Sequence, residues 1–108
     1  MMMIMRVYRC TVVAGKEQEF REFAFTKSHP WLRERPGLIA FHAGSGLPGS
    51  ADHTRCMVNI WESVAAIQAA IGDDWQLPMK LSDEASALIE QATVEHYELA
   101  DEFRAEAR

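Results

Sequence analysis

Residues 58–72 read VNIWESVAAIQAAIG, and they place a strand and a helix next to each other with almost no connecting loop. The apolar run that ends at Trp61 predicts a strand, and Ser63 is predicted to cap the N-terminus of the helix. Apolar positions with helical spacing, closed by a glycine, follow the cap: Val64, Ile67, Ile71 and Gly72. Because residues two apart in a strand share a face, Asn59 and Trp61 are predicted to point to the same side.

Four segments have the β-branched and aromatic composition of strands, at residues 5–13, 38–43, 56–61 and 92–100. Residues 44–55 contain three glycines and a proline, so this segment is predicted to be a long loop between the second and third strands. Residues 73–81 are irregular in pattern. Ser82 is predicted to start a short helix that runs to about Gln91.

The segment after the first strand has the pattern of an amphipathic helix. Its apolar residues recur at spacings of three, four and seven: Phe20, Phe23, Ala24 and Trp31. Pro30 has no amide hydrogen to donate and disfavours the α conformation at His29. The helix is therefore predicted to break or kink at this point and to resume with Ser28 as its cap.

The order strand, helix, strand, strand, helix, strand is that of the split βαβ arrangement. It predicts an α+β, ferredoxin-like fold, in which a four-stranded antiparallel sheet carries both helices on one face. Tyr8 has the same parity as Cys10 and Val12, which suggests that its side chain lies under the helices. Since the other face of the sheet has no cover within one chain, we expect a homodimer whose two sheets pack face to face into a β-barrel.

Composition indicates one globular domain, which we expect to span residues 1–99, followed by a charged tail at 100–108. The net charge is −5 and the 11 lysines and arginines are scattered, which argues against nucleic acid or an anionic membrane as a partner. The start MMMIMR is too short for a signal peptide or a membrane span, so a cytoplasmic location is expected. Cys10 and Cys56 are too few for a disulfide framework, and whether they share a face depends on strand register.

Four stretches of the chain carry a resemblance: VYRCTVVAGKEQEFREFA, RPGLIAFHAG, MVNIWESVAAIQAAIG and EHYEL. In this order they resemble the antibiotic biosynthesis monooxygenase domain, a dimeric ferredoxin-like family, over about residues 5 to 99. That family contains cofactor-free monooxygenases of quinols and polyketides, haem-degrading enzymes, and members that process aldehydes or signals. The resemblance thus implies the fold and the dimer, and leaves the activity open among these classes.

The haem-degrading branch of the family has an Asn in the first strand, a Trp in the second helix and a His soon after it. In this chain the corresponding positions hold Tyr8 and Ala70, and no His lies between Trp61 and His96. Haem degradation is therefore not expected.

The cofactor-free monooxygenases hold an aromatic substrate as its anion in a pocket between sheet and helices, using Asn, Trp, Tyr and Arg side chains. The resemblance thereby implies catalytic roles for Asn59, Trp61 and Tyr8. Independently of the resemblance, His42 or else His96 is a candidate general base for an acidic phenol, because an imidazole titrates near neutral pH. Trp75 is also of a residue type that this pocket uses, and its place with Met79 after the second helix suits a lid over a cavity. Trp75, Phe23 and Met79 are accordingly the candidate substrate contacts. No cofactor and no metal are expected, since no pair of histidines has the spacing of a helical metal site and no carboxylate cluster completes one.

Ordinary structural roles remain open for each of these residues. Trp61 can be core that anchors the second helix, Asn59 can pair with backbone or face solvent, and Tyr8 can be packing. Correspondingly, the alternative to a monooxygenase of a small quinol-like aromatic is a non-catalytic dimer that binds a ligand or a partner protein.

Overall fold

A computed structural model describes residues 2–79 and 82–106. In chain order, its elements are β1 (Ile4–Val12), α1 (Glu17–Phe23), a π-helical turn (Ala24–Ser28), α2 (His29–Arg33), β2 (Leu38–Ser45), β3 (Thr54–Trp61), α3 (Val64–Ile71), α4 (Asp83–Ser86) and β4 (Ile89–Glu98). No helix in the described part of the chain is long and apolar enough to cross a membrane.

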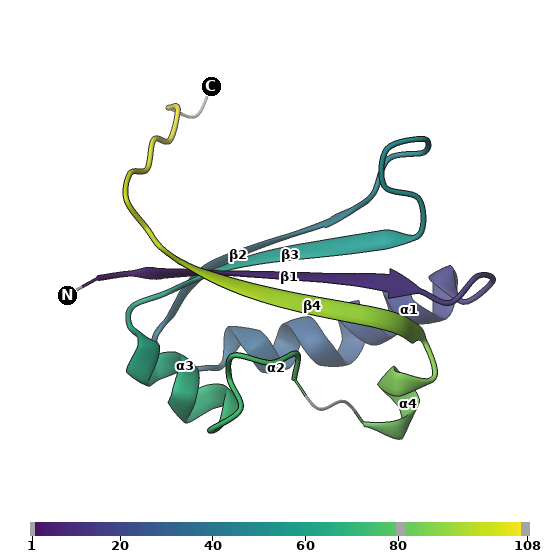
Figure 1. Cartoon of the computed structure of the whole chain (residues 1–108), viewed down its shortest axis with the longest axis horizontal. Helices are drawn as coiled ribbons and strands as arrows, with labels where there is room; N and C mark the ends of the chain where they lie inside the picture. Colours follow the sequence, from purple (N-terminus) through teal and green to yellow (C-terminus); the bar gives the residue numbers. More distant parts are fainter. Residues whose placement is uncertain (1, 80–81, 107–108) are drawn as a thin grey trace.

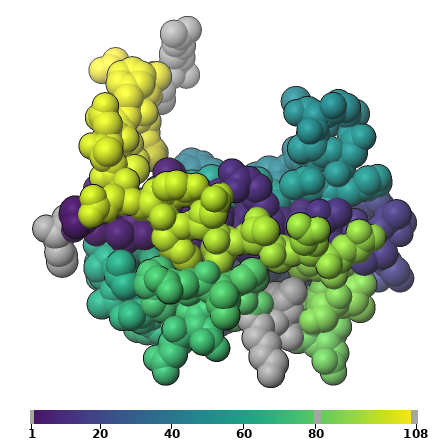
Figure 2. All heavy atoms as spheres, viewed as in Figure 1, coloured from purple at the N-terminus to yellow at the C-terminus, as the bar shows by residue number. Residues whose placement is uncertain are grey.

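The strands form one antiparallel sheet in the order β2-β3-β1-β4, with the helices on one face (Figure 1). The predicted ferredoxin-like fold is confirmed. On the side away from the helices, the β2–β3 loop and the C-terminal tail both project outward, and Figure 2 shows a broad hollow between them. We use the term open face for the side of the sheet without helices.

The centre of the domain lies between the sheet and the helices. Ile4 and Trp61 are paired across β1 and β3, and both are buried there against Leu32 of α2 and Ile67 of α3. Trp61 is fully buried, with 0% of its surface exposed. The alternation along β1 places Arg6, Tyr8, Cys10 and Val12 on this same helix-covered face.

The segment that begins at residue 58 passes from strand to helix as predicted. Ser63 is extended, and its Oγ accepts a hydrogen bond from the Ala66 amide at 3.1 Å. Gly72 closes α3 with a φ of 106°, a conformation that favours glycine. These two ends fix the direction of α3 immediately after Trp61.

The helix between β1 and β2 is interrupted just before Pro30, near the predicted break or kink, but the chain does not leave the helical conformation there. Residues 24–28 form a wide π turn instead, in which the His29 amide donates to the Ala24 carbonyl five residues earlier. The chain stays helical through His29, and Pro30 lies in the first turn of α2, where a missing amide hydrogen is tolerated. Ser28 is itself helical and makes no capping hydrogen bond, which also corrects its predicted role.

Several predicted boundaries shift. β2 and β3 each extend two residues into the expected loop, so the connection between them is residues 46–53. Ser82 caps α4 as predicted, but the helix ends at Ser86 and β4 begins at Ile89. The chain joins the sheet early because the Val13 amide donates to the Leu88 carbonyl at 2.9 Å, which extends the pairing with β1.

The two cysteines are free and lie on opposite faces of the sheet. Cys10 is paired with Arg55 and Cys56 with Arg9 across the same two strands, so their side chains alternate. Cys10 is buried under the helices, whereas Cys56 is half-buried on the open face. The register therefore separates the two thiols.

Replacing Gly37 with alanine is expected to destabilise the domain more than replacing Gly15. Both glycines have a positive φ, 86° and 84°, which costs an alanine roughly 1–2 kcal/mol. An added Cβ at Gly37 also falls 2.5 Å from the Cβ of Ala66, whereas nothing lies within 4 Å at Gly15. Overpacking typically adds about 1–3 kcal/mol. Urea unfolding of both variants measures the difference, and equal losses would contradict a close contact between Gly37 and α3.

Candidate functional site

The middle of the helix-covered face collects polar and aromatic side chains from three strands and one connecting segment. We call this set the polar cluster; its members are Arg6, Tyr8, Asn59, Trp61, Trp75 and His96. Arg6 of β1 is paired with Asn59 of β3 on one side and with His96 of β4 on the other. Paired residues share a face, so these three side chains form a row across the sheet.

Arg6 is buried, with 3% of its surface exposed. Its Nη1 donates to the Trp75 carbonyl at 2.6 Å and contacts His96 Nε2 at 2.7 Å. No carboxylate lies within ion-pair distance of it among the described residues. Burial lowers the pKa of Arg6 to about 10, with the neighbouring Tyr8 acting in the opposite direction. The guanidinium is therefore still charged at neutral pH, and both of these partners are neutral groups.

His96 is held as a neutral acceptor by this arrangement. A guanidinium only donates, so Nε2 of His96 accepts and the ring carries its hydrogen on Nδ1. Burial lowers the pKa of His96, and the charge of Arg6 lowers it further. The ring also meets Trp75 edge-on, with centroids 4.7 Å apart. Arg6 and His96 thus both hold the segment that carries Trp75 against the sheet.

Asn59 and Trp61 are the buried polar side chains of β3, with 5% and 0% of their surfaces exposed. They point to the same side, as predicted. Neither the Asn59 Nδ2 nor the Trp61 Nε1 has a hydrogen-bond partner within the described part of the chain. A buried donor without a partner costs about 1–3 kcal/mol. Two of them lie next to each other on one face of β3, and this needs an explanation.

Tyr8 is half-buried on the same face, as its parity with Cys10 predicted. Burial raises the pKa of the Tyr8 phenol, and the nearby Cys10 thiol raises it further. Burial raises the pKa of Cys10 as well. Both groups are thus protonated at neutral pH, and Tyr8 is suited to donate a hydrogen bond rather than to act as a base.

The other predicted site residues lie outside the polar cluster. Phe23 is half-buried on α1, and Met79 is largely exposed on the segment after α3. His42 is paired with Val58 and is exposed on the open face. The sheet therefore separates His42 from Asn59 and Trp61, so the structure does not bring this general-base candidate to them.

Arg6 is the residue that the sequence analysis missed. It has the same parity as Tyr8, so the alternation that places Tyr8 under the helices also places a guanidinium there. A charged residue on the buried side of an apolar strand was the available signal.

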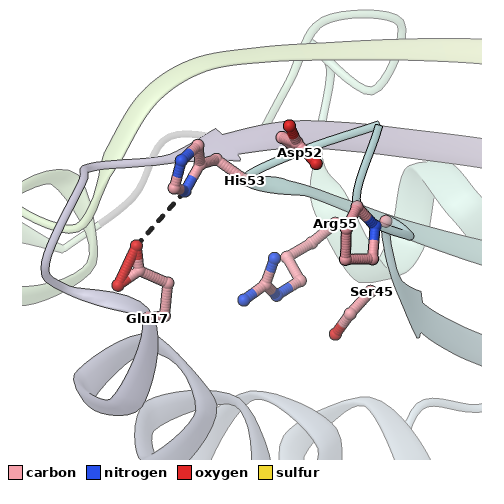
Figure 3. Close-up of a pocket in the computed structure, with 7 residues that line it drawn as sticks. Glu17, Ser45, Asp52, His53 and Arg55 are labelled. Carbon is pink, nitrogen blue, oxygen red and sulfur yellow. Dashed lines mark ion pairs between the residues drawn. The ribbon is translucent and has the colours of Figure 1, made fainter. Parts of the chain in front are cut away.

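Two recesses are lined by residues that do not belong to the polar cluster. One, of about 370 Å³, lies between the β2–β3 loop and α1 and is lined by Glu17, Ser45, Gly46, Pro48, Asp52, His53 and Arg55 (Figure 3). There the His53 Nδ1 lies 3.2 Å from a Glu17 carboxylate oxygen, and His53 has a φ of 62°. This contact joins the loop to the start of α1. The other, of about 350 Å³, is lined by Ile71, Asp73, Asp74, Leu77, Pro78 and Met79.

Metal ligands do not gather in groups of three or more among residues 2–79 and 82–106. The polar cluster itself supplies hydrogen-bond donors, one cation, a neutral imidazole and aromatic surfaces.

The architecture is shared with solved structures at low sequence identity. A protein of unknown function from Nitrosomonas europaea superposes with a TM-score of 0.71 at 20% identity, over 98% of each chain. SnoaB, a cofactor-independent oxygenase from Streptomyces nogalater, gives 0.64 at 18% identity, over 96% of this chain and 97% of its own. A haem-degrading protein from Mycobacterium tuberculosis gives 0.64 at 19% identity, over 96% and 98%.

No family model and no curated protein matches the sequence. The three solved structures named above are at most 20% identical to this chain; one is of unknown function, and the other two have different activities. The likeness accordingly establishes the fold of this chain and leaves its function to the chemistry of its own residues.

Proposed function

We propose that this chain is a cofactor-independent oxygenase that binds a small acidic aromatic molecule in the polar cluster. The observation that carries the proposal is the pair of buried, unpaired donors, Asn59 Nδ2 and Trp61 Nε1. A phenolate or enolate oxygen accepts two such hydrogen bonds, so a bound ligand would remove the cost of leaving them unmade. The shared fold with an oxygenase that uses no cofactor supports this choice.

The reaction needs little from the protein beyond binding. In an anthrone, the deprotonated ring donates one electron to dioxygen, and the radical pair recombines into a carbon–peroxide bond. Loss of water then leaves a ketone: one oxygen atom stays on carbon and the other leaves with the two hydrogens of the methylene group. Substrate and dioxygen supply all the electrons, so the residues need only desolvate and orient the anion.

In this proposal the active protein is a homodimer that forms through the open face. Apolar residues of three strands lie on that face: Tyr97, which is 45% exposed, the half-buried Val58, and Val7 and Ile60, which are already buried within one chain. The β2–β3 loop and the tail stand on either side of it with a hollow between them (Figure 2), and in this proposal the sheet of a second copy occupies that hollow. Two sheets packed face to face are a common way of covering such a surface.

Oxygen uptake tests the activity. Purified protein is assayed with a panel of hydroquinones and anthrones, together with Asn59→Ala, Trp61→Phe and the control Gln68→Ala on the exposed side of α3. We expect uptake with one or more of these substrates, reduced by about 10²-fold or more when one donor to the developing oxyanion is lost, and unchanged in the control.

The alternative function is a dimer that binds a ligand without reacting. Ligand-induced thermal shifts with the same panel distinguish it, because binding without uptake favours the alternative. If neither uptake nor a shift occurs with any of these molecules, the proposal fails for this substrate class.

A further inference from the structure

We infer that, in the homodimer, the C-terminal tail of each copy packs against the β2–β3 loop of the other, with Phe103 of the tail beside Leu47 of the loop. The tail in question is residues 99–106, and the loop is residues 46–53. The inference rests on the proposed function only for the existence of a dimer through the open face, and it adds which segments of the two copies meet. It depends on no ligand and on no reaction.

Two large apolar side chains are exposed on the segments that flank the open face. Phe103 has 89% of its surface exposed and Leu47 has 72%, the two highest values for large hydrophobic residues in the described part of the chain. The tail and the loop that carry them both project beyond the open face (Figure 1). Single exposed apolar residues are common, but two that rim one uncovered sheet face mark a candidate contact.

The loop is held in one shape although its apolar side chain is exposed. The Ala51 amide donates to the Leu47 carbonyl at 3.0 Å, and the His53 carbonyl accepts from the Val12 amide at 2.8 Å. The His53 Nδ1 also lies 3.2 Å from a carboxylate oxygen of Glu17, which ties the loop to α1 (Figure 3). A loop organised in advance presents its side chain to a partner at little entropic cost.

The tail leaves the sheet at the end of β1 that lies away from the loop. The Leu99 amide donates to the Met3 carbonyl at 2.9 Å, just before β1 begins. β1 is nine residues long, roughly 30 Å, whereas four extended residues from Leu99 to Phe103 span up to about 14 Å. Phe103 therefore does not reach Leu47 of its own chain. Packed sheets lie about 10 Å apart, so the tail is long enough to cross to a partner.

The charges distinguish the two ways of joining the open faces. When two sheets pack with aligned strands, a two-fold axis along the strands puts tail against tail, and an axis across them puts each tail against the partner's loop. The tail carries three carboxylates and one guanidinium, so two tails side by side repel each other. The loop carries one carboxylate, Asp52, and the half-exposed Arg9 lies on the open face toward that end of β1. Charge thus favours the tail-to-loop arrangement.

Engineered cysteines test which segments meet. The variants are Leu47→Cys, Phe103→Cys and the two together, all with Cys56→Ala, which leaves the buried Cys10 as the one natural thiol. Both new positions are exposed, so the fold is expected to be kept. The control is Leu47→Cys with Gln68→Cys, because Gln68 is exposed on α3, on the helix side of the sheet. Each protein is oxidised with copper phenanthroline at micromolar concentration, and non-reducing electrophoresis measures the covalent dimer.

We expect at least about tenfold more covalent dimer in the double variant than in either single variant or in the control, because a dimer holds facing thiols at an effective concentration of the order of millimolar. Covalent dimer from Phe103→Cys alone would show tail against tail, and from Leu47→Cys alone, loop against loop. Either result would overturn the inference.

Truncation of the same two side chains gives a second, non-covalent measurement. Phe103→Ala and Leu47→Ala should each raise the dissociation constant of the dimer by about tenfold or more, since both copies lose the contact. The two together should be no weaker than the weaker single variant within about twofold, because both remove one shared contact. The control Leu77→Ala, at a position that is 59% exposed after α3, should have no effect. Effects that multiply would show that the two side chains do not meet.

The mass in solution and oxygen uptake separate this inference from the proposed function. A wild-type protein that is monomeric at micromolar concentration removes the dimer and this inference with it, and a dimer whose double cysteine variant does not cross-link removes this inference alone. Cross-linking of tail to loop without oxygen uptake would keep the inference and remove the oxygenase. Uptake by a dimer without this cross-link would do the reverse.

Discussion

Trp61→Ala is expected to lower the free energy of unfolding by about 3–5 kcal/mol, the range for deleting a large buried aromatic side chain. Trp61 is fully buried and packs with Ile4, Leu32 and Ile67, so its loss leaves a cavity where β1, β3, α2 and α3 meet. Domains of this size are stable by only about 5–15 kcal/mol. The substitution should therefore remove between about one fifth and all of the stability, which chemical denaturation followed by circular dichroism measures as a lower midpoint.

Trp61→Phe separates the packing role of this residue from a binding role. The phenyl ring keeps most of the buried surface and leaves a smaller cavity, so a loss of about 1–2 kcal/mol is expected. The indole N–H has no partner in the described part of the chain, so its removal breaks no internal hydrogen bond. We expect a folded protein with weaker anion binding and slower oxygen uptake. Wild-type binding and uptake in this variant would show that Trp61 is core alone.

Val58→Asp is expected to convert a dimer into a monomer. Val58 lies in the middle of the open face, between Val7 of β1 and His42 of β2. The proposed face-to-face dimer is two-fold symmetric, so each copy would bury one new carboxylate against the apolar surface of the other. Burying an unpaired charge costs on the order of 3–5 kcal/mol, so the dissociation constant should rise at least about 100-fold.

The control for this variant is Ala65→Asp, on the exposed side of α3, where a carboxylate near the helix N-terminus is favourable. Light scattering after size exclusion, at several concentrations, gives the mass of all three proteins. Wild-type protein and Ala65→Asp should be dimeric at micromolar concentration, and Val58→Asp monomeric. A wild-type protein that is already monomeric would rule out the dimer.

The sequence predicted the fold because the order of elements and the two-residue parity of the strands are local properties. The cap at Ser63 and the shared face of Asn59 and Trp61 followed from the same patterns, and both are confirmed. Register is a property of pairs of strands, so no local pattern could tell that Cys10 and Cys56 point to opposite faces. For the same reason the side of the sheet that carries His42 was undetermined.

The polar cluster was only half predictable. Asn59, Trp61 and Tyr8 could be predicted from the sequence of a single strand, because their residue types suit a site and the alternation along the strand gives the face on which they lie. The link between Arg6, His96 and Trp75 joins residues 69 and 90 positions apart, and it depends on a backbone carbonyl that no residue type identifies. Contacts of this kind arise from the fold as a whole.

The π turn at Ala24–Ser28 determines which side chains of the following helix, α2, point toward the sheet. Ala24 and His29 are both buried, although five residues of α-helix would separate their directions by roughly 140°. The wide turn absorbs the additional residue and returns Leu32 to the sheet side. If one residue were deleted within this turn, a regular α-helix would place the same apolar residues on the sheet side. Shortening α1 by one residue would instead rotate all later positions away from the core.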